Sequence, residues 1–195
     1  SPARINYFVD NATLVEEHIA GVPGDLFIKY YFDNPEFNRV RIAKEFVKFN
    51  ERCFVRLLGD MRSYNYVFDI TPDFEEVQFR IRTIDFDQQS YEGRLNLYLP
   101  QFFKENYPLV KLVQDKLSPE TVEQYRKEER TLIARRIKSS RVRLKELLDV
   151  MTVDNIAPIE KVTQLKTELA AHYTDNAFLD CQTMGQIVKH SLEIL

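Results

Sequence analysis

The sequence predicts an α+β fold in which helices are the majority. Two strand-like runs, 66–70 and 77–84, stand in the middle of the chain with turn-forming residues between them. After residue 100 the pattern changes to amphipathic segments, in which apolar residues recur every three or four positions. A short run of strands followed by a run of helices is typical of α+β domains.

The composition is that of an ordinary globular protein. The 195 residues are 44% hydrophobic and 29% charged, which suffices for one sizeable core or two small ones. The formal net charge of −3 gives no electrostatic reason to expect nucleic acid or an acidic membrane as a partner. No apolar run reaches the roughly 18 residues of a membrane span, and the N-terminus lacks a signal pattern, so we expect a cytoplasmic protein.

The two cysteines and three histidines do not predict a metal site. Cys53 and Cys181 follow no metal-ligand spacing, and the histidines are scattered along the chain. We expect two free thiols in a reducing cytosol, and a disulfide between them stays an open alternative.

The chain is expected to begin with a β-hairpin. Strand candidates occupy 5–9 and 12–17, and Asp10-Asn11 between them suits a two-residue turn. A connector with two glycines and a proline follows at 19–24, and it fits neither the apolar period of a helix nor that of a strand. The apolar residues of 25–32 are too closely spaced to distinguish a short helix from a strand.

A first long helix is predicted over about 35–55. Asn34 suits the N-cap and Pro35 the first helical position. One face of this helix would be apolar, with its stripe formed by Val40, Ala43, Phe46, Val47 and Phe54.

Helices also account for most of the second half. After a loop over 88–99, a helical piece starts near residue 101 and is interrupted by Pro108. Ser118, followed by proline and an acid, predicts a helix start, and this helix can run to about residue 150. Further helices are predicted over 158–172 and, capped by Thr183, to the end of the chain.

Three polar side chains converge if the central strands form a hairpin. The connector 71–76 contains a proline and an aspartate, which suit a turn, so Ile70 is expected to pair near Val77. The ladder then brings Asn65 and Asp85 to one end of the hairpin, and Asp60 lies on the loop that enters it. The plainer alternative is that these residues only cap turns and end a strand.

Carboxylate and amide oxygens at one spot suit phosphoryl transfer. That reaction needs metal ions on the nucleotide phosphates and a carboxylate that orients the acceptor hydroxyl. Magnesium takes one or two carboxylate or amide oxygens and completes its shell with phosphate and water. Asn65 and Asp85 are therefore the candidate metal ligands, and Asp60 is the candidate catalytic base.

Residues 59–67, Gly-Asp-Met-Arg-Ser-Tyr-Asn-Tyr-Val, resemble the catalytic loop of the protein-kinase-like superfamily, in its aminoglycoside phosphotransferase and choline kinase branch. Ile84-Asp85-Phe86 resembles its metal-binding segment. The stretch 14–21 looks like the last N-lobe strand and the hinge. The resemblance implies Mg²⁺ and ATP as cofactors, adenine held near Glu17 and Ile19, an N-lobe remnant over 1–24 and a helical C-lobe over 25–195. The implied reaction is phosphate transfer to a hydroxyl of a small molecule or an atypical target.

The chain also departs from that family. Leu58 stands where histidine is usual, and Asp87 stands where a protein kinase has glycine. The segment after Asp87 is short, which argues against a eukaryotic-type protein kinase. No glycine-rich loop and no strand lysine precede residue 5. We therefore expect either a fragment that needs an N-lobe from elsewhere or a degenerate member, and a pseudokinase-like or helical interaction module is the alternative function.

A last alternative concerns the basic stretch 126–145. Its lysines and arginines could face an acidic partner, with Arg135, Arg136 and Arg141 as the contacts. Glutamates are interspersed among them, so a solvated helix face is the preferred interpretation.

Overall fold

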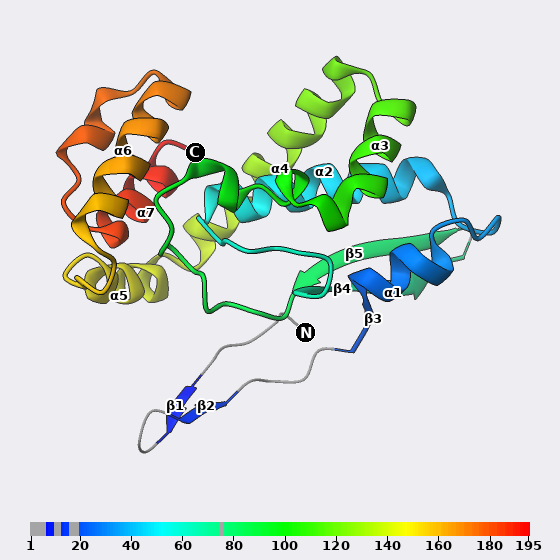
Figure 1. Cartoon of the computed structure of the whole chain (residues 1–195), viewed down its shortest axis with the longest axis horizontal. Helices are drawn as coiled ribbons and strands as arrows, with labels where there is room; N and C mark the ends of the chain where they lie inside the picture. The colour runs from blue at the N-terminus through cyan, green and yellow to red at the C-terminus, as the bar shows by residue number, and fades with distance from the viewer. Residues whose placement is uncertain (1–6, 10–12, 16–19, 75) are drawn as a thin grey trace.

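The computed structural model describes residues 7–9, 13–15, 20–74 and 76–195. Within these ranges the fold is α+β and mostly helical, as the sequence predicts. Figure 1 shows a long helix, α2 (Arg39–Val55), running along a β-hairpin, with α3 (Tyr107–Lys116) and α4 (Pro119–Ser139) on its other side. The helices α5 (Arg141–Met151), α6 (Ile159–Tyr173) and α7 (Met184–Glu193) gather beyond one end of α2.

The central sheet has three antiparallel strands in the order β3 (Val22–Pro23), β4 (Tyr66–Pro72) and β5 (Val77–Thr83). The ladder between β4 and β5 extends two residues further toward the turn than the expected pairing of Ile70 near Val77. Ile70 pairs with Phe79, and Pro72 pairs with Val77. Pro72 is tolerated inside the strand because β3 reaches only Val67 and Phe68, so the missing N–H is not needed. The turn lies over 73–76, where the Asp73 amide donates to the Glu76 carbonyl at 3.0 Å.

A two-stranded pair, β1 (Tyr7–Val9) and β2 (Thr13–Val15), corresponds to the hairpin expected at the start of the chain. The expected turn at Asp10-Asn11 lies outside the described residues.

Helix α2 begins four residues later than predicted. The Asn38 side chain is its cap and accepts hydrogen bonds from the amides of Val40 and Arg41 at 3.0 and 3.3 Å. Asn34 instead closes a separate turn through the Glu36 amide at 3.0 Å. Val40 is consequently exposed, whereas the other members of the predicted stripe are buried, namely Ala43, Phe46, Val47 and Phe54.

The ambiguous segment 25–32 is helical. A short turn, α1 (Gly24–Leu26), continues into a π-helical turn over Phe27–Tyr31. The Phe27 ring is fully buried and stacks on the ring of Phe68 with centroids 3.8 Å apart. Gly24 lets the start of this helical segment pass close to a second ring, because a Cβ there would stand 2.2 Å from the Tyr66 ring.

Between the sheet and α3 the chain is not a plain loop. It forms 3₁₀ turns at Leu95–Tyr98, Pro100–Phe102 and Lys104–Asn106. The prediction that Pro108 interrupts a helix is wrong. Pro108 stands in the first turn of α3, where the backbone N–H that proline lacks would have no partner within the helix.

The predicted helix from Ser118 to residue 150 is two helices. The Ser118 cap is confirmed, but the chain bends at Ser140, where φ is −118° and ψ is 26°. Two adjacent serines, which favour turns over helix interiors, occupy the break. Helix α6 and the Thr183 cap of α7 lie where they are predicted. A 3₁₀ turn at Asn176–Asp180 connects the two helices.

Two hydrophobic clusters fill the interior. The first packs α2, α3 and the sheet around Phe46, Phe49 and Phe68. The second packs α5, α6 and α7, and Phe54 near the end of α2 belongs to it. Helix α2 therefore contributes to both clusters.

Both cysteines are free and buried, as expected, one in each cluster. Burial raises the pKa of the Cys53 thiol to about 12, which keeps it unreactive. Among the described helices, none has both the length and the apolar character that crossing a membrane requires.

Candidate functional site

The β4–β5 hairpin brings Asn65 and Asp85 to the same end. Tyr66 pairs with Thr83 at that end of the ladder, and the Ile84 amide donates to the Asn65 carbonyl at 3.1 Å. Asn65 thus lies just before the start of β4, and Asp85 lies two residues after the end of β5, at the same end of the hairpin. The backbone positions of these two residues therefore lie at one end of the hairpin, as the strand pairing predicts.

The loop that carries Asp60 is fixed by backbone hydrogen bonds to the segment after the hairpin. The Gly59 amide donates to the Gln88 carbonyl at 3.1 Å, and the Asp60 amide donates to the Leu97 carbonyl at 3.2 Å. Asp60 itself has φ of 54°, a left-handed conformation that aspartate tolerates better than most residues. The segment predicted as a loop therefore holds the candidate base in place.

Asn65 ties Asp60 to the hairpin. Its Nδ2 donates to the main-chain oxygen of Asp60 at 2.7 Å and lies 3.4 Å from the Oδ2. Asn65 is 8% exposed, and none of the residues that the structure describes donates a hydrogen bond to its Oδ1. One side chain therefore positions the carboxylate-bearing loop and keeps an amide oxygen free for another ligand.

The Asp60 carboxylate is partly exposed, and each of its two oxygens has a hydrogen-bond partner. Its Oδ1 accepts a hydrogen bond from Arg62 Nε at 2.9 Å, and Arg62 Nη1 reaches Glu105 at 2.9 Å. The same guanidinium lies over the ring of Phe103, 5.1 Å from its centroid. Hydrogen bonds to the two carboxylates raise the pKa of Arg62, which stays charged.

Sequence reasoning did not assign Arg62 or Glu105. Arg62 stands inside the 59–67 motif, so its spacing from Asp60 could have identified it. Glu105 is 43 residues away from Arg62, and no sequence signal links the two.

Asp87 adds a third carboxylate to the site. Its amide donates to Asp85 Oδ1 at 3.1 Å, which brings the two acidic side chains together. Partial desolvation, the neighbouring Asp85 carboxylate and the charge of Asp60 raise the pKa of Asp87 above its usual value. The resemblance to kinases identifies Asp87 only as a residue that stands where a protein kinase has glycine. In the structure its carboxylate adds to the negative charge at the end of the hairpin.

This excess of negative charge suits a cation, with ligands from outside the chain. Asp85 and Asn65 Oδ1 are oxygen donors of the kind that Mg²⁺ prefers. Within the part of the chain that the structure describes, no three His, Cys, Asp or Glu side chains are grouped closely enough to hold a metal ion. Any ion here would therefore complete its shell with phosphate or water oxygens.

The candidate adenine-binding residues, Glu17 and Ile19, lie outside the described residues. The nucleotide side of the predicted site therefore has no described geometry, and the site consists of its metal side and its base.

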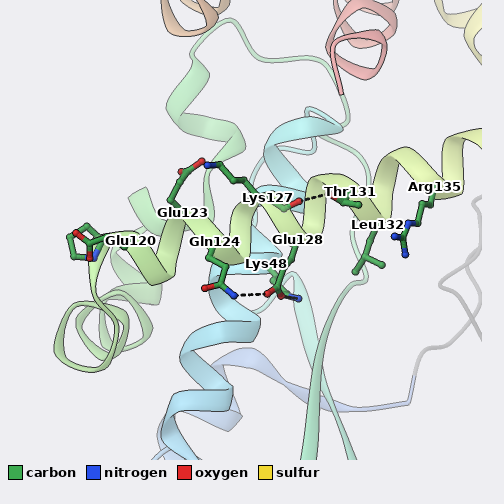
Figure 2. A pocket seen from close by; sticks show the side chains of 10 residues that line it. Lys48, Glu120, Glu123, Gln124, Lys127, Glu128, Thr131, Leu132 and Arg135 are labelled. Carbon is green, nitrogen blue, oxygen red and sulfur yellow. Dashed lines mark hydrogen bonds and ion pairs between the residues drawn. The ribbon is translucent and has the colours of Figure 1, made fainter.

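A large surface hollow lies elsewhere. It has a volume of about 1050 Å³ and follows one face of α4, where Figure 2 shows Lys48 of α2 reaching Glu128. That ion pair measures 2.9 Å, and Gln124 also donates to Glu128, at 3.2 Å. Acidic, basic and neutral side chains alternate along this face, which agrees with a solvated helix surface rather than an anion-binding one.

The end of the hairpin thus offers a carboxylate held on a fixed loop, an amide oxygen beside it, and two further carboxylates across the strand end. Such a set can accept a proton from a hydroxyl and can bind a divalent cation. The chain matches no protein-family model, no curated protein and no solved structure, so its function is argued from these side chains.

Proposed function

We propose that the protein is a kinase-like, ATP- and Mg²⁺-dependent phosphotransferase, with Asp60 as the base and Asn65 and Asp85 as metal ligands. The observation that carries the proposal is the double role of Asn65. Its Nδ2 donates to the Asp60 main chain at 2.7 Å, while its Oδ1 accepts no hydrogen bond from a described residue, and it stands at the end of the hairpin that leads to Asp85. A loop carboxylate followed five residues later by such an asparagine is the arrangement that kinase catalytic loops use.

In this mechanism Asp60 orients the acceptor hydroxyl and takes its proton as the phosphoryl group arrives. Arg62 donates to Oδ1 at 2.9 Å, whereas Asn65 Nδ2 lies at a longer 3.4 Å from Oδ2, so Oδ2 is the more weakly held oxygen and would face the acceptor. Asn65 keeps the loop in register with the hairpin, and Asp85 supplies the second cation ligand. Asn65 and Asp85 would hold a magnesium ion, which would supply positive charge against the nucleotide phosphates. The acceptor is a hydroxyl of a small molecule or of an atypical target.

The test is Mg²⁺-dependent turnover of ATP by the wild-type protein and by Asp85→Asn. We expect the variant to lose at least about 100-fold in turnover, because metal ions and positioned groups supply most of the rate in phosphoryl transfer. Asp69→Asn is the matched control, since Asp69 lies on the same hairpin but pairs with Arg82 at 2.8 Å. Equal turnover in the wild-type protein and Asp85→Asn would refute the assignment.

The alternative, a pseudokinase-like or helical interaction module, is favoured by one specific contact. Arg62 links Asp60 to Glu105, so the candidate base is already neutralised by an ion pair. If this alternative holds, Mg-ATP gives no turnover and no magnesium-dependent rise in Tm, because a ligand stabilises only a state that binds it.

A further inference from the structure

A second polar pocket lies where the C-terminal ends of α2 and α4 meet strand β5. It encloses about 660 Å³, and none of the ten side chains that line it is acidic. Half of them are arginines that come from three elements, namely Arg52, Arg56, Arg80, Arg82 and Arg136. The hydroxyl-bearing side chains of Thr83 and Ser140 also line it.

Three of these arginines are paired with carboxylates. Arg52 Nη2 contacts Glu45 at 2.5 Å, and its Nη1 lies 3.4 Å from Glu129. Arg80 lies 3.9 Å from the same two glutamates, which are buried. Arg82 pairs with Asp69, and these acids therefore balance the three arginines from outside the lining of the pocket.

The other two arginines leave an excess of positive charge. Arg56 and Arg136 are exposed, and neither has a carboxylate partner within the described ranges. Arg56 Nε donates only to the Arg52 main-chain oxygen, at 3.0 Å. Arg136 is close enough to repel both Arg56 and Arg80.

The pocket also has a buried arginine among its lining residues. Arg52 is 5% exposed, and its Nη1 makes no hydrogen bond to any described residue despite facing Glu129. Burial and the neighbouring charge of Arg52 lower the pKa of Arg80. An anion in the pocket would offset the repulsion among these guanidinium groups.

We propose that this pocket binds a multiply charged oxyanion of the phosphate class. Guanidinium groups present planar pairs of donors that match phosphate oxygens, and converging guanidiniums favour charges greater than one. The protein as a whole carries a net charge of −3, so this cluster is a local feature rather than part of a basic surface. The proposal does not depend on phosphotransfer at the hairpin end, because it needs neither Asn65 nor Asp85.

Inorganic pyrophosphate is the probe, added to the full chain in buffer with EDTA so that no divalent cation takes part. Calorimetric titration measures its Kd, and thermal unfolding is compared with sodium chloride at the same ionic strength. We expect pyrophosphate to raise the Tm more than chloride does. Arg136→Gln should weaken binding about tenfold or more, because a charge-assisted hydrogen bond is lost.

Arg143→Gln is the matched control. Arg143 is exposed on α5, has no carboxylate partner among the described residues, and makes the same change in net charge. We expect the Kd of this variant to equal that of the wild-type protein. The proposal is overturned if pyrophosphate stabilises no more than chloride, or if Arg143→Gln weakens binding as much as Arg136→Gln does.

Discussion

At the scale of single residues, the ionised carboxylate of Asp87 is destabilised by the other acidic groups of the candidate site. It stands beside Asp85 and within the field of Asp60, and its raised pKa means that its ionised form is disfavoured in the folded chain. An acid whose pKa is higher in the folded than in the unfolded state costs stability once it ionises. That cost is absent at low pH and appears as the pH rises through the folded pKa.

Removing this charge should therefore stabilise the metal-free protein. We expect Asp87→Asn to have a higher Tm than the wild-type protein at pH 7 in EDTA, and nearly the same Tm at about pH 2, where the Asp87 carboxyl is protonated in both the folded and the unfolded chain. Differential scanning calorimetry across this pH range measures the difference.

The control for this prediction is Asp180→Asn, an exposed position with the same change in charge. We expect the Tm of Asp180→Asn to equal that of the wild-type protein at pH 7. A Tm of Asp87→Asn at or below that of the wild-type protein at pH 7 would contradict the account of the clustered carboxylates.

At the scale of elements, Thr183 joins two helices through one hydroxyl. Its Oγ1 accepts from the Gln186 amide at 3.2 Å as the N-cap of α7 and donates to the Thr152 carbonyl, just after α5, at 2.9 Å. Close packing of the same helices leaves no room at Gly185, where a Cβ would stand 1.9 Å from the Met151 carbonyl oxygen. The cap therefore also fixes how α7 docks on α5.

Thr183→Ala should cost about 2 kcal/mol of unfolding free energy, because it removes a cap and a second, largely buried hydrogen bond. Thr183→Ser keeps both bonds and should restore most of this loss. Ser118→Ala, which removes the exposed cap of α4 and an exposed contact with the Thr121 hydroxyl, should cost about 1 kcal/mol. Urea unfolding compares the three variants, and equal costs at the two caps would show that the link to Thr152 contributes nothing.

At the scale of the whole molecule, a buried ion network links α2, α4 and β5. Arg52 of α2 lies between Glu45 of the same helix and Glu129 of α4, and Arg80 of β5 approaches both acids. Glu45 also accepts a hydrogen bond from the Ile81 amide at 2.8 Å. Glu129 is fully buried, yet its carboxylate makes no hydrogen bond to any described residue, so it is held by charge alone.

Glu129→Gln should destabilise the protein by about 3 kcal/mol, because it removes one of the two carboxylates that balance the buried Arg52. The neighbouring Glu128→Gln should cost less than about 1 kcal/mol, since that acid pairs with Lys48 at a solvated surface. Denaturant unfolding of the two variants measures the contrast. Similar losses at both positions would show that the network does not hold the three elements together.

Much of the element content was predictable from local sequence signals. Ser118 and Thr183 were assigned as caps correctly because a hydroxyl before an apolar-periodic run acts on its own neighbours. The start of α2 was missed because Asn34 and Asn38 are both good caps, and packing of the following turns selects between them. The break at Ser140 was missed because apolar periodicity continues across it.

The candidate site divides in the same way. The sequence by itself determined that Asn65 and Asp85 share one end of a hairpin, because strand alternation and turn chemistry are local and error by two residues in the turn does not change which ends meet. Only the tertiary structure decided that Arg62 joins Asp60 to Glu105, that residues 88 and 97 hold the loop, and that five arginines from three elements line one pocket. These contacts join residues far apart in the chain, and their positions depend on how whole elements pack.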